Sequence, residues 1–180
     1  VDGTLDNSFN PGTGLDDVVR SISIQSDGKI IIGGDFNFFN GISRRKIARL
    51  NADGTLDGTF NPGTGANWIV YDTAIQSDGK IIIGGDFVNY NGTAINRIAR
   101  LNTNGSLDGT FNPGTGPSSQ VNTASIQSDG KIIIASSFYT YDGTVTNGIC
   151  RLNSNGTLDS TFNVGTGINA QILTTSIQSD

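Results

Sequence analysis

The segment Ile22–Phe36 decides the fold, and it reads I-S-I-Q-S-D-G-K-I-I-I-G-G-D-F. It returns almost unchanged at Thr73–Phe87 and Ala124–Phe138, and its first half returns at Thr175–Asp180. The aspartate of the S-D-G step recurs every 51 residues, with no insertion or deletion between copies. A fixed period of this size indicates a repeat architecture, in which each unit rests on its neighbours.

Composition and pattern predict an all-β chain. The 180 residues include 25 glycines but no glutamate, methionine or histidine. Glycine favours turns, glutamate and methionine favour helices, and no window shows apolar residues at helical spacing. We expect four strands in each copy, which in the first copy are Val19–Gln25, Lys29–Phe36, Ile47–Asn51 and Leu56–Asn61.

Two tight turns predict the register of these strands. A three-residue loop at Ser26–Gly28, with glycine in the left-handed region, sets Ile24 opposite Ile30. The same rule applied to the next turn sets Leu50 opposite Leu56 and Arg49 opposite Asp57. The arginine–aspartate pair recurs in the later copies, as Arg100 with Asp108 and as Arg151 with Asp159.

Ile30–Ile32 is apolar on both faces of its strand, which predicts cover on both sides. A β-propeller with blades of four antiparallel strands meets this requirement, and about three and a half blades fit the chain. A β-solenoid is the alternative, although solenoids usually have shorter periods and fewer tight hairpins. The expected parts of this single repeat domain are a fourth strand of a preceding blade with its loop in 1–18, blades in 19–61, 62–112 and 113–163, and the first strand of a truncated blade in 164–180.

The repeat resembles the bacterial delta-sixty repeat, a β-propeller-type tandem repeat. The likeness rests on D-G-T-L-D-G-T-F-N-P-G-T-G at Asp53–Gly65, I-Q-S-D-G-K-I-I-I-G-G-D-F at Ile75–Phe87 and R-I-A-R-L-N at Arg97–Asn102. Such motifs cover most of the chain, although Ala135–Ser137 departs from the Gly-Gly-Asp of the other copies. The resemblance implies an extracellular or cell-surface setting in a large bacterial protein, and it supplies no catalytic residues.

Charge and residue types exclude several functions. The net charge of −5 argues against a nucleic-acid partner, and no apolar run is long enough for membrane insertion. Without histidine there is no Ser-His-Asp triad and no histidine-bound zinc, so we expect no enzyme. A glycan hydrolase that uses aspartates such as Asp35 and Asp86 is the third-ranked alternative.

We expect no cofactor, although calcium is a weak alternative. The stretch Asn51–Asp57 resembles part of the calcium loops of integrin-type propellers, with Asp53 and Asp57 as candidate ligands. Asp53 is replaced by Asn104 and Asn155 in the later copies. Asparagine serves equally well in a turn but brings no charge, so the turn explanation is favoured.

The copies differ most in two sets of connections, which a propeller places on one rim. These are Leu15–Asp17, Ala66–Trp68, Pro117–Ser119 and Ile168–Ala170 after the fourth strand, and Asn37–Lys46, Val88–Arg97 and Tyr139–Gly148 after the second. We call this surface the loop rim. Loops on a rigid scaffold commonly bind, so the candidate ligand contacts are Trp68, Phe38, Tyr139, Arg44 and Arg45. Phe39, Tyr90 and Tyr141 recur at one position and are expected to anchor the loops instead.

The leading hypothesis is therefore recognition or adhesion, with a protein or glycan bound at the loop rim. A purely structural spacer or a filament or assembly subunit is the alternative. Asn7–Phe9 and Leu173–Ile177 would be open strand edges in such an array, and open edges promote pairing. We expect flanking repeats or self-association to cover them.

Overall fold

The computed structural model describes residues 3–168 and 170–178, and every regular element in these ranges is a strand. No helix able to span a membrane occurs among them. Three antiparallel sheets form: β1 (Val19–Ile24), β2 (Ile30–Gly34) and β5 (Ile47–Leu50); β6 (Val70–Ile75), β7 (Ile81–Gly85) and β10 (Ile98–Leu101); β11 (Thr123–Ile126), β12 (Ile132–Ala135) and β15 (Ile149–Leu152). The predicted all-β class is confirmed.

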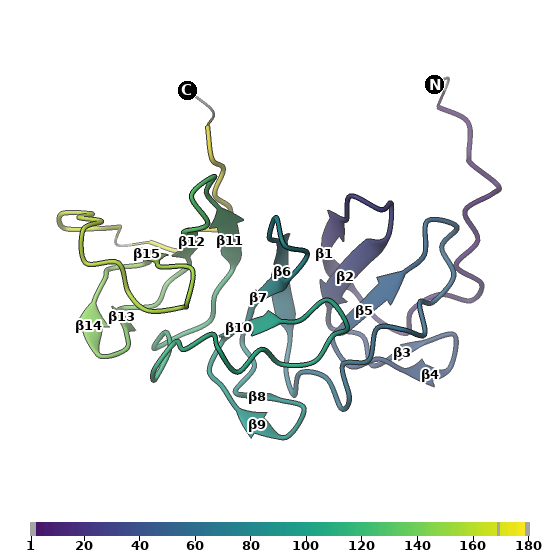
Figure 1. The fold of residues 1–180 in the computed structure, drawn as a ribbon, viewed down its shortest axis with the longest axis horizontal. Coiled ribbons are helices and arrows are strands. Elements are labelled where there is room, and N and C mark those ends of the chain that lie inside the picture. Colours follow the sequence, from purple (N-terminus) through teal and green to yellow (C-terminus); the bar gives the residue numbers. More distant parts are fainter. Residues whose placement is uncertain (1–2, 169, 179–180) are drawn as a thin grey trace.

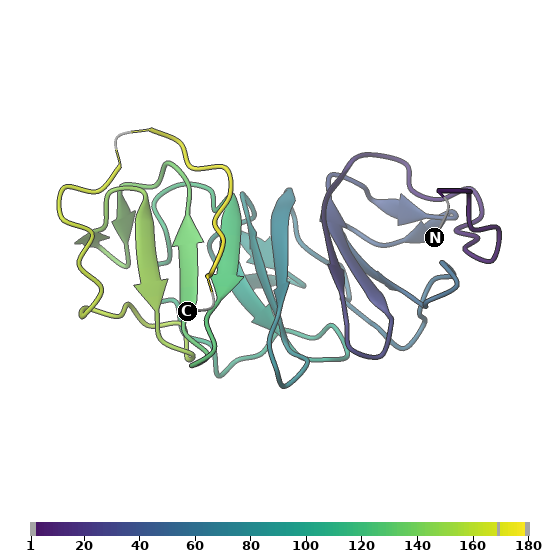
Figure 2. The same cartoon turned by 90° about the horizontal axis from the view of Figure 1, so that it is seen from above.

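A small hairpin extends from each sheet, in the connection between its second and third strands. The hairpins are β3 (Phe38–Phe39) with β4 (Ile42–Ser43), β8 (Asn89–Tyr90) with β9 (Thr93–Ala94), and β13 (Thr140–Tyr141) with β14 (Thr144–Val145). Each sheet with its hairpin is a blade, numbered 1 to 3 along the chain. Figure 1 shows the blades as an arc, with β1, β6 and β11 on its inner side and the hairpins on its outer side. Figure 2 shows the long strands standing side by side when the arc is seen from above.

The predicted hairpin registers are confirmed. Ile24 pairs with Ile30, and the N–H of Gln25 donates to the carbonyl of Lys29 at 2.8 Å. Gly28 has a φ of 82°, the left-handed conformation that this three-residue loop requires. The second turn follows the same rule, because Leu50 and Leu56 form a bridge in blade 1 and their equivalents do so in blades 2 and 3.

The fourth strand is shorter than we expected from the sequence. In blade 1 it is reduced to the single bridge at Leu56. The next residue, Asp57, accepts the backbone N–H and the hydroxyl of Thr59 at 2.9 and 2.6 Å. This local side-chain bonding turns the backbone away from the sheet, so the ladder ends there. Asp108 with Thr110 and Asp159 with Thr161 end the fourth strand in the same way.

The isoleucine triplet of blade 2 is buried between two blades that stand face to face with it. Ile31 of blade 1 shares a core cluster with Ile81 and Ile83 of blade 2. Ile82 points the other way, into a second cluster with residues of blade 3. Burying one isoleucine contributes about 1.5–3 kcal/mol, so these interfaces are the main stabilising feature of the arc. Blade 2 therefore has the cover on both faces that was predicted for blades, whereas Ile32 of blade 1 packs only against residues of its own blade.

The inner strands also contact each other through short hydroxyl side chains. Ser23 Oγ of β1 donates to the carbonyl of Thr73 in β6 at 2.7 Å. Ser125 Oγ of β11 donates in the same way to Thr175, at 3.1 Å. The segment around Thr175 therefore occupies the place of a next inner strand beside blade 3.

Neither end of the described chain forms the strand expected from the sequence. Leu173–Ile177 contains no strand, because it contacts β11 through side chains and has no neighbouring strand with which to form a ladder. Asn7–Phe9 is also irregular, and the chain is held instead by the N–H of Asn10, which donates to the carbonyl of Asp53 at 2.7 Å. Neither segment is a strand, so the expectation of open strand edges at these two segments is wrong.

Candidate functional site

The two sets of variable connections lie together, as a propeller rim requires. Isolated bridges join them in every blade, at Leu15 with Phe39, Ala66 with Tyr90 and Pro117 with Tyr141. In blade 2, Asn67 Oδ1 accepts the backbone N–H groups of Val88 and Asn89, both at 3.0 Å. Asp16 and Ser118 do the same in blades 1 and 3. The fourth connection includes Asn169, which lies outside the described residues.

Asp16, Asn67 and Ser118 occupy one repeat position and therefore have a structural role, although the residue type differs in each blade. Aspartate, asparagine and serine share only a short side chain with an oxygen acceptor, and that oxygen is what the loop requires. Variation among copies at these positions does not indicate ligand contact.

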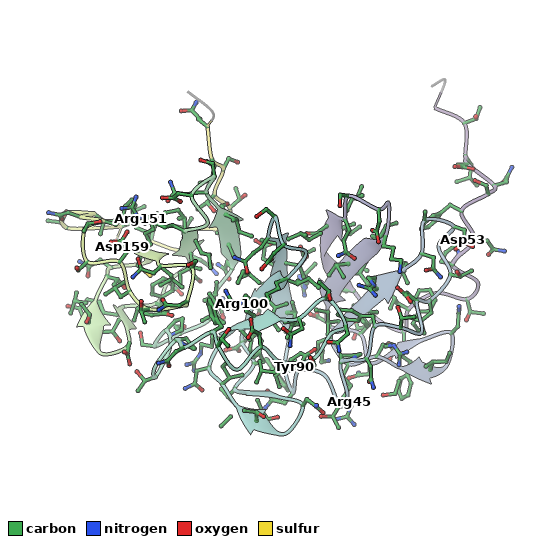
Figure 3. The ribbon with its side chains drawn as sticks, viewed as in Figure 1. Arg45, Asp53, Tyr90, Arg100, Arg151 and Asp159 are labelled. Carbon is green, nitrogen blue, oxygen red and sulfur yellow. The ribbon has the colours of Figure 1, made fainter. Side chains whose placement is uncertain are left out.

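The residues expected to anchor the loops are buried. Phe39, Tyr90 and Tyr141 are all almost inaccessible to solvent. The hydroxyl of Tyr90 donates to the carbonyl of Gly105 at 2.7 Å, and Figure 3 shows Tyr90 within the molecule. Burial raises the pKa of Tyr90 far above its ordinary value, so this hydroxyl remains a donor.

The three candidate aromatic contacts are exposed, one on each blade. The exposed fractions are 47% for Phe38, 56% for Trp68 and 63% for Tyr139. Tyr139 also lines a cavity of about 350 Å³, together with Phe138 and Ile168. These rings are available for contact with a partner.

The two candidate arginines differ in their environments. Arg44 is half-buried and donates to the carbonyl of its neighbour Ser43 at 2.8 Å, so its guanidinium folds back on its own loop. Arg45 is exposed, and Figure 3 shows it on the outer side of the arc. Only Arg45 presents its charge to solvent.

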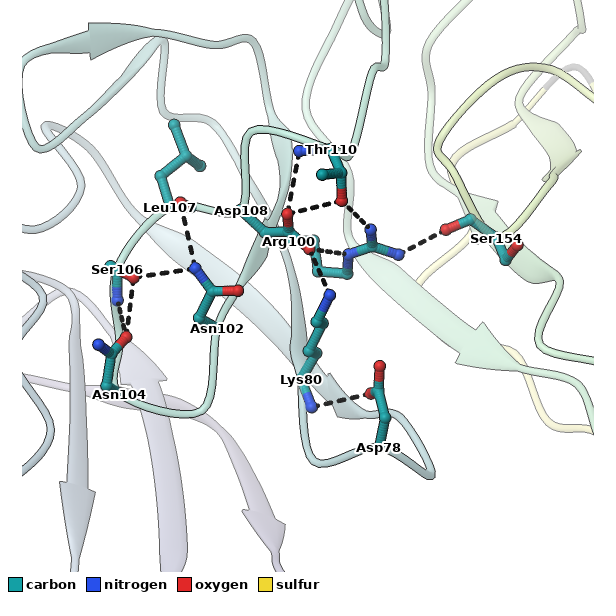
Figure 4. Close-up of polar contacts among 10 residues, drawn as sticks. All are labelled: Asp78, Lys80, Arg100, Asn102, Asn104, Ser106, Leu107, Asp108, Thr110 and Ser154. Atoms are coloured by element: carbon teal, nitrogen blue, oxygen red, sulfur yellow. Dashed lines mark hydrogen bonds and ion pairs between the residues drawn. The ribbon is translucent and has the colours of Figure 1, made fainter.

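All three predicted arginine–aspartate pairs are present, and the structure adds further partners to each. In blade 2, Arg100 Nε and Lys80 Nζ both contact Asp108 Oδ2, at 2.7 and 2.9 Å (Figure 4). Arg100 Nη1 continues to the carbonyl of Ser154 in blade 3, at 2.6 Å. Arg49 reaches Thr103 of blade 2 in the same way, at 2.7 Å. These arginines therefore join adjacent blades.

The aspartates of these pairs are held in the ionised form. Burial alone raises the pKa of Asp108, but hydrogen bonds from Thr110, Lys80 and Arg100 outweigh burial and keep that pKa well below its ordinary value. The same balance lowers the pKa of Asp57.

The calcium candidates do not fit a calcium site. Asp57 is already bonded to Arg49, Lys29 and Thr59, so a calcium ion there would have to displace two cations. Asp53 Oδ1 accepts the N–H and hydroxyl of Thr55, which is the turn role. Within the described ranges, no group of three or more Asp, Glu, His or Cys residues could hold a metal ion.

The two aspartates weighed for glycan hydrolysis are both near arginines. Asp35 Oδ2 lies 2.8 Å from Arg20 Nη2, and Asp86 Oδ1 lies 3.8 Å from Arg97 Nε. Arg20 belongs to a cavity of about 390 Å³ between the inner strands, which sequence reasoning missed. One sequence signal could have pointed to this cavity. Arg20, Tyr71, Asn122 and Leu173 occupy one position of the repeat, yet their side chains differ in charge, size and polarity.

Comparison with known proteins supports the architecture. A comparison with curated proteins finds no match. A family model described as a domain of unknown function (DUF5122) beta-propeller matches residues 25–60, 76–111 and 127–162, which is more than half of the chain. Each match runs from the first hairpin turn through the arginine–aspartate pair to the phenylalanine beyond it. With three tandem matches on three successive blades, the chain belongs to this β-propeller family.

Proposed function

We propose that the chain is a non-enzymatic recognition scaffold that binds a protein or glycan partner at the loop rim. The observation that carries the proposal is the exposure of Phe38, Trp68 and Tyr139 on loops that are otherwise tightly anchored. Aromatic rings supply large contact areas for sugars and for protein hot spots.

Anchoring of the loops favours binding by this surface. Asn67, its equivalents and the buried ring of Tyr90 hold the loops in one conformation. A preorganised surface loses little conformational entropy when a partner binds, so a few exposed rings are enough for useful affinity. The likeness to the delta-sixty repeat supports a bacterial, extracellular or cell-surface setting for such a scaffold.

A glycan array and a bacterial-cell binding assay test the rim. We expect saturable binding by the chain and a loss of about tenfold or more in affinity for Trp68→Ala or Tyr139→Ala, because each removes a stacking surface. Ser77→Ala is the matched control, since Ser77 is exposed in a hairpin turn on the opposite rim. Binding that is absent, or that is equally sensitive to Ser77→Ala, would contradict the proposal.

A second candidate function, as an assembly subunit, is favoured by one specific observation. Ile22 and Ile24 of β1 are 63% and 72% exposed. Their equivalents in β6, Thr73 and Ile75, are covered by blade 1. β1 therefore exposes a surface that contacts a neighbouring blade elsewhere in the arc, and a flanking repeat or a second copy of the chain would cover it.

A further inference from the structure

The inner side of the arc contains a cavity centred away from the exposed rings of the loop rim and from Ile22 and Ile24 of β1. It has a volume of about 390 Å³ and is lined by Arg20, Tyr71, Gln120, Asn122, Gln171 and Leu173. Arg20 lies in β1 and Tyr71 in β6, Gln120 and Asn122 directly precede β11, and Gln171 and Leu173 belong to the segment beside it. Arg20, Tyr71, Asn122 and Leu173 share one position of the repeat, and Gln120 and Gln171 share another. Figure 1 shows β1, β6 and β11 on the inner side of the arc. Small-molecule sites in proteins commonly have volumes of about 300–1,000 Å³.

The repeat position of Arg20 is exceptional within the inner strand. The Ser-Ile-Gln-Ser-Asp stretch at its far end hardly changes between copies, whereas this position holds arginine, tyrosine, asparagine and leucine in turn. The position of Ile22 also varies, but there the later residues are the small side chains Thr73, Ala124 and Thr175, whereas the position of Arg20 varies in size, charge and aromatic character. Four different side chains around one space form an asymmetric lining, which a specific small ligand requires and a purely structural repeat does not.

Among the described residues that line the cavity, Arg20 is the one that carries a charge, and this charge is compensated by Asp35. Arg20 donates through Nη2 to Asp35 at 2.8 Å and more weakly through Nε at 3.4 Å. This ion pair orients the guanidinium and leaves Nη1 without a protein acceptor in the part of the chain that the structure describes. Asp86 has Arg97 as its nearest cation, at 3.8 Å. Paired charges of this kind favour an uncharged ligand with many hydroxyl groups over an ion.

Tyr71 supplies an aromatic surface beside these polar groups. It is half-buried, and its pKa is raised by burial and by the nearby carboxylate of Asp86, so its hydroxyl remains a hydrogen-bond donor. Gln120 Nε2 donates to Asn122 Oδ1 at 3.2 Å, and Asn122 Nδ2 donates to the carbonyl of Ile172 at 2.8 Å, so the amide of Asn122 is fixed and in turn holds Gln120 at the cavity wall. An aromatic ring next to fixed amides and an arginine–aspartate pair matches a sugar, which has apolar C–H faces and hydroxyls at its edge.

We propose that this cavity is a binding site for a neutral sugar of one or two units. Tyr71 stacks on the sugar face, Arg20, held by Asp35, donates to a sugar hydroxyl, and Gln120, held by Asn122, bonds to the opposite edge. None of the exposed rings Phe38, Trp68 and Tyr139 lines this cavity, and Gln171 is the residue that it shares with the cavity beside Tyr139. We therefore expect the rim rings and this site to bind independently.

Saturation-transfer NMR and isothermal titration of the full chain test this site. The probes are the methyl glycosides of glucose, galactose, mannose and N-acetylglucosamine, together with maltose, cellobiose and lactose. We expect saturable binding of at least one probe, weakened about tenfold by Tyr71→Ala and little changed by Tyr71→Phe, which keeps the ring. Gln120→Ala is a second variant that leaves the ring in place and should also weaken binding.

Controls separate this site from the rim and from misfolding. Trp68→Ala and Tyr139→Ala alter the rim and should leave titration of these sugars unchanged. Each variant is compared with the wild type by circular dichroism and thermal unfolding. The proposal is overturned if no probe binds saturably, if correctly folded Tyr71→Ala and Gln120→Ala bind as tightly as wild type, or if methyl glucuronide alone binds.

Discussion

Asp108 accepts bonds from an arginine, a lysine and a threonine, and its arginine continues to the next blade. The carboxylate of Asp108 thus joins Lys80, Arg100 and the turn at Thr110 within blade 2. Through Arg100 it is also connected to blade 3. The ring of Phe111 lies under the same guanidinium, with Arg100 Cζ 5.2 Å from its centroid. Removing the negative charge leaves two buried or half-buried cations without their partner.

We expect Asp108→Asn to lower the free energy of unfolding by about 3–5 kcal/mol, the range found when one partner of a buried ion pair is removed. Urea unfolding measures the change. Asp159→Asn is the matched variant, since Arg151 has a more exposed side chain, 20% against 9% for Arg100, and no bond to a further blade is present among the described residues. A smaller loss is therefore expected there, and equal losses would show that the link between blades contributes nothing.

The low pKa of Asp108 also makes stability depend on pH. Its folded-state pKa lies below the ordinary value of 3.8, so the unfolded chain takes up this proton first as pH falls. The stabilisation is complete well above pH 3.8 and is lost as the pH falls below that value towards the folded-state pKa. We expect wild-type unfolding free energy to decrease on acidification below about pH 5, with a shallower decrease in Asp108→Asn. Parallel pH profiles for the two proteins would contradict this assignment.

At the scale of the strands, the second residue after the isoleucine triplet in the second strand of a sheet lies close to the start of the first strand. β7 ends at Gly85, and a Cβ atom at that residue would lie 2.1 Å from the carbonyl oxygen of Ile69. Blade 3 has Ser136 at the equivalent position, and there β11 starts only at Thr123, later than β6 does in its repeat. The departure at Ala135–Ser137 noted in the sequence is therefore accompanied by a shorter inner strand.

Gly85→Ala tests this close approach. We expect a loss of about 1–3 kcal/mol in unfolding free energy, because overpacked positions force the backbone to shift. Gly109→Ala is the matched control in the same blade, since nothing lies within 4 Å of its added methyl group and its φ is not positive. Chemical denaturation of both variants measures the difference, and equal stability would show that the strand can move away at no cost.

At the scale of the whole molecule, the outer blades decide how the chain assembles. The inner strands of adjacent blades meet through hydroxyls and isoleucines, and β1 exposes the same kind of surface. Leu173, 72% exposed, lies on the segment that takes the next inner position beside blade 3. A head-to-tail contact between these two surfaces would repeat the contact between blades.

We expect the 180-residue chain to self-associate in sedimentation velocity at micromolar concentration, and the double variant Ile22→Thr/Ile24→Thr to sediment as a monomer. Thr73 of β6 occupies the repeat position of Ile22, so a threonine is compatible with the strand at this position. Ile42→Thr, which replaces an exposed isoleucine on β4, is the control and should associate as wild type does. A wild-type chain that is monomeric at all concentrations would exclude the assembly function for this segment.

What the sequence by itself determined is the local and the repeated part of the structure. The pairing of Ile24 with Ile30 follows from one short loop, and the pairing of Arg49 with Asp57 follows from another. The 51-residue period and the apolar triplet Ile30–Ile32 were enough to predict blades covered on both faces. Exposure of Trp68 and burial of Tyr90 could be predicted because one position varies between copies and the other recurs.

Only the tertiary structure decided what happens between blades. The bond from Arg100 to Ser154 and the inner cavity around Tyr71 are not visible in any single copy. The physical reason is that the repeat pattern specifies each sheet through neighbours in sequence, whereas the angle and distance between sheets depend on side-chain packing across 51 residues or more. The side chains that line the inner cavity come together only after that packing is complete.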